Sequence, residues 1–233
     1  MVPLKDLQAL KTEQRRLAQL VIQKEEQKLD LPKIRTITGI DVAYSGSTGI
    51  AGAVTLEANT NNILEMKTAV MEVHFPYIPT FLSYRELPPL IRVFKRLTQH
   101  TDIFMIDGHG IAHPRGLGLA SHFGIEVNQP TIGVAKKLLV GEPEFCPECS
   151  GEWAKLIYQG KPIGAILRSR QNGKPIFISV GHLISLSKSI EIVKLVLSPQ
   201  QRIPEPLRLA DQLTRRKKRE FELKKDNHKM EGL

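Results

Sequence analysis

The chain has 233 residues, of which 41% are hydrophobic, and its 33 Lys and Arg outnumber 24 Asp and Glu to give a net charge of +9. This length suits one large α/β domain with a core of its own, and the positive charge favours a polyanionic partner such as nucleic acid. No apolar run approaches the roughly 18 residues of a membrane helix, and the N-terminal residues lack the apolar stretch of a signal peptide. Cys146 and Cys149 are the only cysteines, which excludes a disulfide framework. We therefore expect a monomeric protein of the reducing cytoplasm, without membrane contact or an obligate protein partner.

The first third of the chain predicts one helix and three strands. Leucines from Leu4 to Leu20 recur at helical spacing and predict an amphipathic helix that ends before Pro32. Strands are expected over 34–44, 50–57 and 63–75, which would form an antiparallel meander. Asp41 lies in the first strand, on the face that it shares with Gly39 and Ala43 and not on the more apolar face.

A stiff segment and a helix follow the meander. Pro76 and Pro79 restrict the backbone on both sides of Tyr77, so this aromatic residue lies in a non-helical segment. Residues 83–86 are predicted to open a helix, with Pro88–Pro89 in its first turn.

The stretch from 102 to 136 predicts a βαβ unit that organises the rest of the chain. Residues 103–106 are a continuous apolar run, typical of a strand that is buried on both faces. A helix is expected up to Val127 and a second parallel strand over 130–135. Open α/β sheets hold their ligands at the carboxyl ends of such strands. That edge here receives an acid, two histidines and a lysine: Asp107, His109, His113 and Lys136.

The remainder of the chain is less distinctive. Short strands are predicted over 153–158, 164–168 and 175–180, followed by a helix over 183–197. A last helix after Pro206 leads into a charged segment. We predict one domain over residues 1–214 and a basic, flexible tail over residues 215–233.

Three carboxylates lie at element ends or on the less apolar strand face, namely Asp41, Glu86 and Asp107. They would meet if the sheet is mixed, with the first strand beside the Asp107 strand. Clustered carboxylates repel one another unless a cation is present, and oxygen-only ligands suit Mg²⁺ or Mn²⁺. In a basic protein such a site points to phosphodiester hydrolysis.

Each of these residues also has a purely structural interpretation. Asp41 could be a surface strand residue, Glu86 could close a capping box and Asp107 could cap the following turn. His113 and Lys136 could be an ordinary loop histidine and a surface charge. Tyr77 could be a core aromatic, and Asp211 could pair with Arg215 on a solvated helix face.

Two other patterns carry less weight. The glycines after Asp107 fit neither common nucleotide-binding motif. Cys146 and Cys149 have zinc-knuckle spacing, but the sequence has no second cysteine pair to complete four ligands.

Four motifs closely resemble the endonuclease V family of deoxyinosine-specific repair nucleases: ITGIDVAY, PYIPTFLSYRE, IDGHGIAHPRGLGLASHFG and PTIGVAK. The resemblance runs from Thr36 to Lys136, with weaker support up to Asp211. It implies a ribonuclease H-like fold, a mixed sheet flanked by helices. It also implies Mg²⁺-dependent hydrolysis, with Mn²⁺ as a substitute, at the second phosphodiester 3′ to inosine, leaving 3′-hydroxyl and 5′-phosphate ends.

The resemblance assigns roles to individual positions. Asp41, Glu86 and Asp107 match the metal-binding acids, and Asp211 in RLADQ resembles a fourth, more distant acid. Lys136 matches a lysine that would donate to the attacked phosphate or water. The histidine that would order the metal or its water corresponds to His113.

Further matches concern the lesion. Tyr77 matches a wedge that holds strands apart, together with Pro76, Ile78 and Pro79, and the lesion pocket would include Thr80, Leu82 and Gly108. Two positions depart from the family pattern: Thr80 stands where Gly is frequent, and Tyr84 stands where Phe is frequent.

Two other functions remain open. One is an inosine-specific endoribonuclease or another structure-specific ribonuclease H-like nuclease, which cleavage position on matched DNA and RNA substrates would distinguish. The other is a catalytically silent nucleic-acid binder, against which the complete acid set argues.

Overall fold

The computed structural model describes residues 4–24 and 31–231, and the described residues fold around one nine-stranded sheet. Its strand order is β3-β2-β1-β4-β5-β9-β8-β7-β6. The strands are β1 (Thr36–Ser45), β2 (Thr48–Glu57), β3 (Ile63–Glu72), β4 (Ile103–Asp107), β5 (Thr131–Ala135), β6 (Glu142–Pro143), β7 (Trp153–Tyr158), β8 (Lys161–Leu167) and β9 (Ile176–His182). β4 pairs in parallel with β1 and β5, and the other neighbouring pairs are antiparallel. The predicted mixed sheet, with β1 beside β4, is confirmed.

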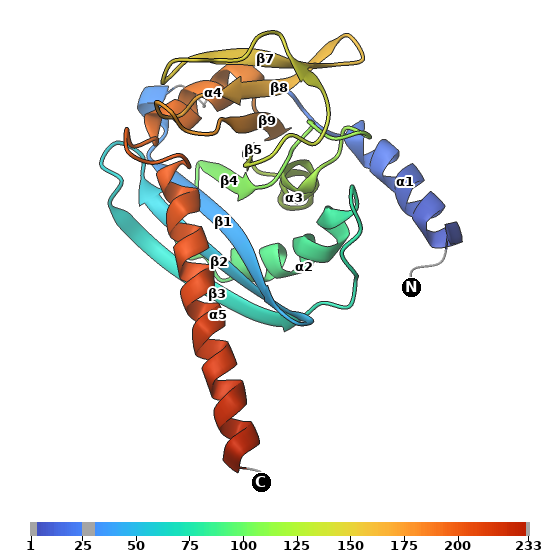
Figure 1. Ribbon diagram of the computed structural model, residues 1–233, viewed down its shortest axis with the longest axis vertical. Helices are drawn as coiled ribbons and strands as arrows, with labels where there is room; N and C mark the ends of the chain where they lie inside the picture. The colour runs from blue at the N-terminus through green and yellow to red at the C-terminus, as the bar shows by residue number, and fades with distance from the viewer. Residues whose placement is uncertain (1–3, 25–30, 232–233) are drawn as a thin grey trace.

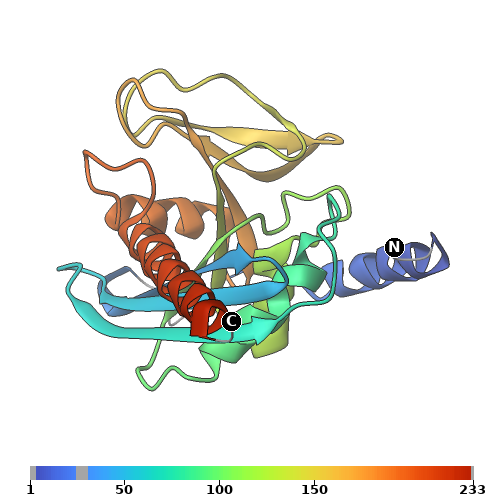
Figure 2. The same cartoon turned by 60° about the horizontal axis from the view of Figure 1, so that its bottom comes forward.

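Helices cover both faces of this sheet (Figures 1 and 2). They are α1 (Leu4–Ala18), a short 3₁₀ helix (Leu31–Lys33), α2 (Leu82–Phe94), α3 (Leu119–Val127), α4 (Leu186–Leu195) and α5 (Glu205–Glu231). α2 and α3 pack on one face, whereas α4 and α5 lie on the other. None of the helices within the described residues is long and apolar enough to cross a membrane.

The alternation of side chains along β1 and β4 decides which residues meet which helices. Ile40, Phe104 and Ile106 belong to the core under α2 and α3. Ile37 and Met105 point the opposite way, into the core under α4 and the start of α5. Because side chains alternate across a strand, Asp41 and Asp107 share the α5 side with Ile37 and Met105.

The predicted N-terminal helix is shorter than expected. α1 ends at Ala18, where the amides of Leu20 and Val21 bond in tight turns to the carbonyls of Leu17 and Ala18. The chain then brings the Ile22 amide to 3.3 Å from Nδ1 of His182 on β9. Residues 25–30, where the predicted helix would have continued, lie outside the described residues.

The helix α2 also differs from the prediction, because Pro88 and Pro89 lie inside it and not in its first turn. A proline lacks the N–H that would bond to the carbonyl four residues earlier. For Pro89 that carbonyl belongs to Arg85, and the hydroxyl of Tyr44 donates to it at 3.2 Å. β1 therefore supplies the donor that the helix lacks, next to Glu86.

The last helix continues through the basic segment. α5 runs from Glu205 to Glu231 without a break at Thr214, and its distal half projects beyond the sheet in Figure 1. Ion pairs one turn apart accompany this extension, for example Lys217 with Glu220 at 2.9 Å and Lys218 with Glu222 at 3.7 Å. Such pairs support an exposed helix. The predicted domain boundary thus falls inside a continuous helix.

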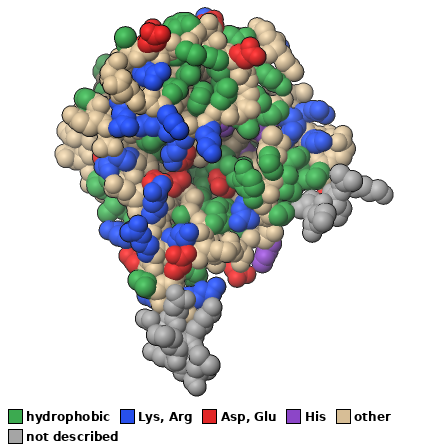
Figure 3. All heavy atoms as spheres, viewed as in Figure 1, with side chains coloured by type: hydrophobic (Ala, Val, Ile, Leu, Met, Phe, Trp, Pro, Cys, Tyr) green, Lys and Arg blue, Asp and Glu red, His purple; other side chains and the backbone are tan. Residues whose placement is uncertain are grey.

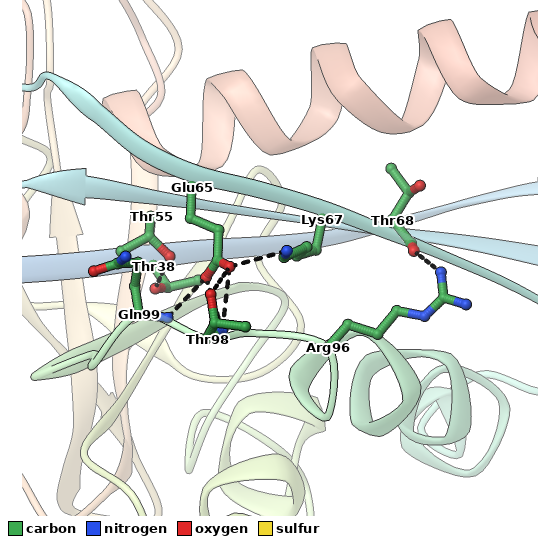
Figure 4. Close-up of polar contacts among 8 residues, drawn as sticks. All are labelled: Thr38, Thr55, Glu65, Lys67, Thr68, Arg96, Thr98 and Gln99. Carbon is green, nitrogen blue, oxygen red and sulfur yellow. Dashed lines mark hydrogen bonds and ion pairs between the residues drawn. The ribbon is translucent and has the colours of Figure 1, made fainter.

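A polar cluster fixes the connection between α2 and β4 (Figure 4). The buried carboxylate of Glu65 on β3 accepts from Thr98 Oγ1 at 2.6 Å and from the amides of Thr98 and Gln99 at 3.1 Å. Arg96 donates to the Thr68 carbonyl at 2.6 Å. α2 carries Glu86 and β4 carries Asp107. These hydrogen bonds therefore fix the C-terminal end of α2 relative to the start of β4, and so help to position the two acids relative to each other.

Candidate active site

The site begins where β1 and β4 run side by side. Their last paired residues are Ile40 and Ile106, so Asp41 and Asp107 follow at the next position of each strand. Asp107 is the final residue of β4, whereas β1 continues beyond Asp41 to pair with β2. Two carboxylates are therefore neighbours on the same face of the sheet.

The helix α5 closes this face because two glycines let it approach. A side chain at Gly39 would meet the Pro206 backbone at 2.3 Å, and one at Gly52 would meet the Thr214 side chain at 2.8 Å. This close approach puts the Thr214 hydroxyl 3.0 Å from Oδ2 of Asp41. It also brings Asp211, one turn earlier on α5, into the site.

Lys136 connects the acids from the other side. It directly follows β5, and its ammonium hydrogen-bonds to Oδ2 of Asp107. The same nitrogen lies 3.9 Å from Oδ1 of Asp211, whose other oxygen pairs with Arg215 at 2.9 Å. One lysine thus reaches toward two acids from different parts of the chain.

The acids are close enough to change one another's protonation. Burial and the charge of Asp107 raise the pKa of Asp41 to about 6, against the favourable effects of Lys136 and Thr214. Burial, Asp41 and Asp107 raise the pKa of Glu86 to about 8. Burial opposes the charge on Lys136, but its acidic neighbours, Asp107 first, raise its pKa overall. The site therefore holds more negative charge than one lysine can neutralise.

This donor set has the chemistry that a hard divalent cation requires. It offers carboxylate oxygens, and a cation would offset the burial and the mutual repulsion that raise the pKa of Asp41 and Glu86. Within residues 4–24 and 31–231, however, no three His, Cys, Asp or Glu side chains already surround a common point as a bound ion would need. Instead, the ammonium of Lys136 donates a hydrogen bond to the carboxylate of Asp107. The residues fit a cation in chemistry and charge, and their oxygens would have to draw together around it.

A cavity of about 130 Å³ is lined in part by residues that lie close in sequence to Glu86 and Asp107. α2 contributes Leu82 and Ser83, one turn before Glu86, and the loop after β4 contributes His109, two residues after Asp107. The other lining residues are Tyr77, Pro79, Thr80, His113, Leu117, Gly118, Leu119 and Leu139. Its wall is mainly apolar, which suits a flat aromatic base.

Tyr77 stands at the mouth of this cavity with 69% of its surface exposed. This exposure excludes the alternative that Tyr77 is a core aromatic. Pro76 and Pro79 are exposed around it and Ile78 is half-buried, while the Ile78 carbonyl accepts from the Phe81 amide at 3.0 Å. The aromatic ring is thus presented to solvent on a short, stiff segment.

Thr80 holds this segment in place through its carbonyl. The carbonyl accepts from Gln14 Nε2 and His113 Nε2 at 3.0 Å each and from Arg115 Nη2 at 2.7 Å. Arg115 Nη2 also lies 2.7 Å from the Thr80 hydroxyl. Thr80 has φ +67°, in the left-handed region that a β-branched residue rarely adopts. We call Gln14, His113, Arg115 and Thr80 the Thr80 clamp.

His113 is neutral within this clamp. Burial and the nearby Arg115 lower its pKa to about 4. Because its Nε2 faces a carbonyl oxygen, Nε2 carries the proton, and Nδ1 accepts from the Arg115 amide at 3.2 Å. Its bonds therefore engage the segment that carries Tyr77.

The structure brings most of the predicted catalytic residues together but places His113 in a different group. Asp41, Glu86, Asp107, Lys136 and Asp211 form the acid cluster, whereas His113 belongs to the clamp. Of the predicted pocket residues, Thr80 and Leu82 line the cavity. Gly108 lies outside that lining, and its amide donates to the Val134 carbonyl at 3.1 Å.

Three contributors were not identified from the sequence: Gln14, Arg115 and Thr214. Gln14 is fully buried and interrupts the leucine stripe of α1 between Leu10 and Leu17, so a polar residue on an apolar helix face was the available signal. Thr214 lies one turn after Asp211 on the same helix. Gln14 and Thr214 bond to residues that are distant in sequence, Thr80 and Asp41, and local patterns do not reveal such contacts.

Basic side chains border the acidic ones on this face. Figure 3 shows Lys and Arg side chains gathered beside acidic side chains in the middle of the face shown, and more of them where α5 descends. Residues 215–225 of α5 contain seven Lys or Arg and two Glu. A surface of this kind attracts a phosphate backbone.

Known proteins resemble this chain in both sequence and fold. The sequence model of the Endonuclease V family matches residues 15–212. Endonuclease V of Rippkaea orientalis is 40% identical over 213 residues, covering 91% of each chain. The crystal structure of Endonuclease V from Streptomyces avermitilis has a TM-score of 0.82 at 35% identity and covers 94% of this chain and 95% of its own.

A third comparison involves a nucleic-acid complex. Endonuclease V of Ciona intestinalis, in complex with a 24mer DNA containing an inosine followed by a ribo-adenosine, has a TM-score of 0.83 at 26% identity, covering 93% of this chain and 99% of its own. The predicted fold, a ribonuclease H-like mixed sheet flanked by helices, is confirmed by these structures. From the family match and the extent of these similarities, the chain belongs to the endonuclease V family.

Proposed function

We propose that this endonuclease recognises deoxyinosine, the product of adenine deamination, and hydrolyses the second phosphodiester bond on its 3′ side. The products would carry 3′-hydroxyl and 5′-phosphate ends. The observation that carries the proposal is the cluster of Asp41, Glu86 and Asp107 next to a largely apolar cavity. The inosine-containing DNA bound to the Ciona relative supports the choice of lesion.

We propose Mg²⁺ as the cofactor, with Mn²⁺ able to substitute. Asp41, Glu86 and Asp107 would hold it, with Asp211 more distant. When bound, such an ion activates water and stabilises the leaving oxygen. Oδ2 of Asp107 now bonds to Lys136, so Lys136 would leave this oxygen and donate to the attacked phosphate or to the attacking water.

The exposed ring and the cavity would divide the work of recognition. Tyr77 would enter the stack where the inosine leaves it, because its stiff segment is already ordered and costs little further entropy. Extruding a base costs a few kcal/mol and least at a weakly paired lesion. The base would occupy the cavity lined by Thr80 and Leu82. We propose that neutral His113 keeps the wedge segment in place, and its ordering of the metal or its water stays a prediction.

A second candidate function is cleavage of inosine-containing RNA. The Ciona complex carries a ribo-adenosine directly after the inosine, which shows that a relative accommodates a 2′-hydroxyl next to the lesion.

The free thiols of Cys146 and Cys149 support the further proposal that the protein works in the reducing cytoplasm.

One experiment separates these functions. Four 5′-labelled substrates carry a single inosine in single-stranded DNA, duplex DNA, single-stranded RNA and duplex RNA, each with an inosine-free twin. We expect Mg²⁺-dependent cleavage at the second phosphodiester bond 3′ to inosine, directly after its 3′ neighbour, and no cleavage of the inosine-free twins. Cleavage that ignores inosine, or that falls at another bond, contradicts the proposed function. The ratio of DNA to RNA rates decides between the two candidates.

A further inference from the structure

Arg202, in the connection between α4 and α5, bonds three backbone carbonyls with one guanidinium. Its Nη2 lies 2.7 Å from the carbonyl of Lys136 and 2.7 Å from that of Pro175, and its Nε lies 2.9 Å from that of Lys174. The Arg202 backbone is held in turn, because Ser169 Oγ donates to its carbonyl at 2.7 Å. The side chain is half-buried.

These bonds lie where the ladder between β5 and β9 ends. The last pair of that ladder is Ala135 with Phe177. Two carbonyls lie beyond this last pair: that of Lys136, directly after β5, and that of Pro175, directly before β9. Pro175 has no N–H with which the ladder could continue. Arg202 supplies the missing donor and ties the two strand ends together.

Lys136 is therefore held at two points. Its ammonium lies in the acid cluster against Asp107, while Arg202 holds its carbonyl at the other end of the residue. The next carbonyl, that of Lys137, lies 3.0 Å from His109 Nε2. A lysine side chain has four flexible carbons, so the position of its ammonium depends on a backbone that does not move.

We propose that Arg202 is a positioning residue for the endonuclease reaction, which fixes the backbone of Lys136 and thereby aims its ammonium at the reacting phosphate. This rests on the proposed role of Lys136. Arg202 itself does not touch the acids through any of its bonds, so its effect would fall on the rate of the chemical step and not on nucleic-acid affinity.

The chain offers a matched control in Arg168. Its guanidinium also bonds two loop carbonyls, those of Pro147 at 2.7 Å and Gly173 at 2.5 Å, but neither carbonyl belongs to Lys136 or to another residue of the site. Arg202→Met and Arg168→Met therefore remove comparable bonds. We expect both to lower the melting temperature to a similar extent, while only Arg202→Met lowers the rate.

The test measures kcat and KM on a deoxyinosine-containing DNA duplex in Mg²⁺. A displacement of about 1 Å in a catalytic group costs up to about 100-fold in rate, so we expect Arg202→Met to lower kcat by about 10- to 100-fold. KM should stay within about 3-fold, because uniform binding is untouched. For Arg168→Met, kcat should stay within about 2-fold of the wild type.

Arg202→Lys separates positioning from charge. It keeps a positive charge near Asp107 but lacks the planar fork that reaches several carbonyls, and it is less disruptive than methionine if Arg202→Met folds poorly. We expect kcat to recover only in part. Full recovery would assign the effect to charge and overturn the positioning role, as would a kcat of Arg202→Met equal to that of Arg168→Met.

Lys136→Met distinguishes failure of this inference from failure of the proposed function. If Lys136→Met cleaves at the wild-type rate, the proposed role of Lys136 is wrong, and the positioning role of Arg202 fails with it. If Lys136→Met is slow but Arg202→Met is not, the inference about Arg202 alone is overturned. Faster amide exchange over residues 134–138 in Arg202→Lys than in Arg168→Met is the expected independent signature.

Discussion

Glu86→Gln should stabilise the protein when divalent cations are absent, although it removes a residue of the proposed active site. Burial and the neighbouring Asp41 and Asp107 raise the pKa of Glu86 to about 8 from 4.5. In the folded state the group therefore holds a proton that it releases on unfolding at neutral pH. Stability should fall as pH rises through this window, because the unfolded state binds fewer protons than the folded state.

The pKa values set the size of the effect. At about 1.4 kcal/mol for each pH unit between 4.5 and about 8, the upper limit of the penalty is about 5 kcal/mol. Relaxation of the acids and entry of water reduce it, so we expect a gain of roughly 2–4 kcal/mol for Glu86→Gln at pH 8.5. At pH 4.5, below the raised pKa values of Asp41 and Glu86, both of these carboxyl groups are protonated in the folded wild type, and the gain should largely vanish.

The assay is urea unfolding in EDTA at pH 4.5 and pH 8.5, with Glu142→Gln, an exposed position on β6, as the control. Addition of Mg²⁺ at pH 8.5 should reverse the order, because the wild type gains binding energy that the variant lacks. If Glu86→Gln is no more stable than the wild type in EDTA at pH 8.5, burial and the neighbouring acids do not penalise the ionised Glu86 as inferred. An equal response of both proteins to Mg²⁺ would remove Glu86 from the cation site.

Three further predictions concern the other parts of the site. Asp107→Asn should abolish Mg²⁺-dependent cleavage while inosine binding persists, since Asp107 is not one of the residues that line the cavity; cleavage near the wild-type rate would remove Asp107 from the catalytic machinery. Tyr77→Ala should leave the melting temperature within about 2 °C, because the ring is 69% exposed, and should slow cleavage of duplex more than of single strands; equal losses on both would refute the wedge. Deletion of residues 215–233 should reduce the slope of log binding constant against log salt concentration for undamaged DNA, by the equivalent of several phosphate contacts, without moving the cleavage position. An unchanged slope would mean that the basic segment of α5 is a solvated helix that does not contact DNA.

Local patterns were sufficient for the centre of the sheet. The apolar run before Asp107 and the one before Lys136 end abruptly, and each strand ends where its pattern does. Because parallel strands align their carboxyl ends, Asp107 and Lys136 could be placed at one edge without the structure. Asp41 could be placed beside them only on the condition that the first strand pairs with the Asp107 strand, which it does. The same reasoning could not foresee how far α2 extends ahead of Pro88, because the compensating donor, Tyr44, lies on another strand.

Long-range contacts account for most of what the sequence did not reveal. Thr214 and Asp41 are 173 residues apart, and Gln14 and Thr80 are 66 apart, so neither pair leaves a periodic signal. α5 was expected to lose its order after Thr214 because the segment is so highly charged. Charge of one sign would favour that outcome, but glutamates one turn away from the lysines let the helix continue.

Thr80 shows why a position cannot be judged by residue type alone. A left-handed backbone favours glycine, which the resemblance in sequence also led us to expect at this position, yet this chain places a β-branched residue there at φ +67°. Such a conformation costs of order 1–3 kcal/mol and persists only where the surroundings enforce it. Three donors on the Thr80 carbonyl and a fourth contact to its hydroxyl do so. The hydroxyl bond to Arg115 is one that glycine could not make, so the threonine that strains the backbone also tightens the clamp that presents Tyr77.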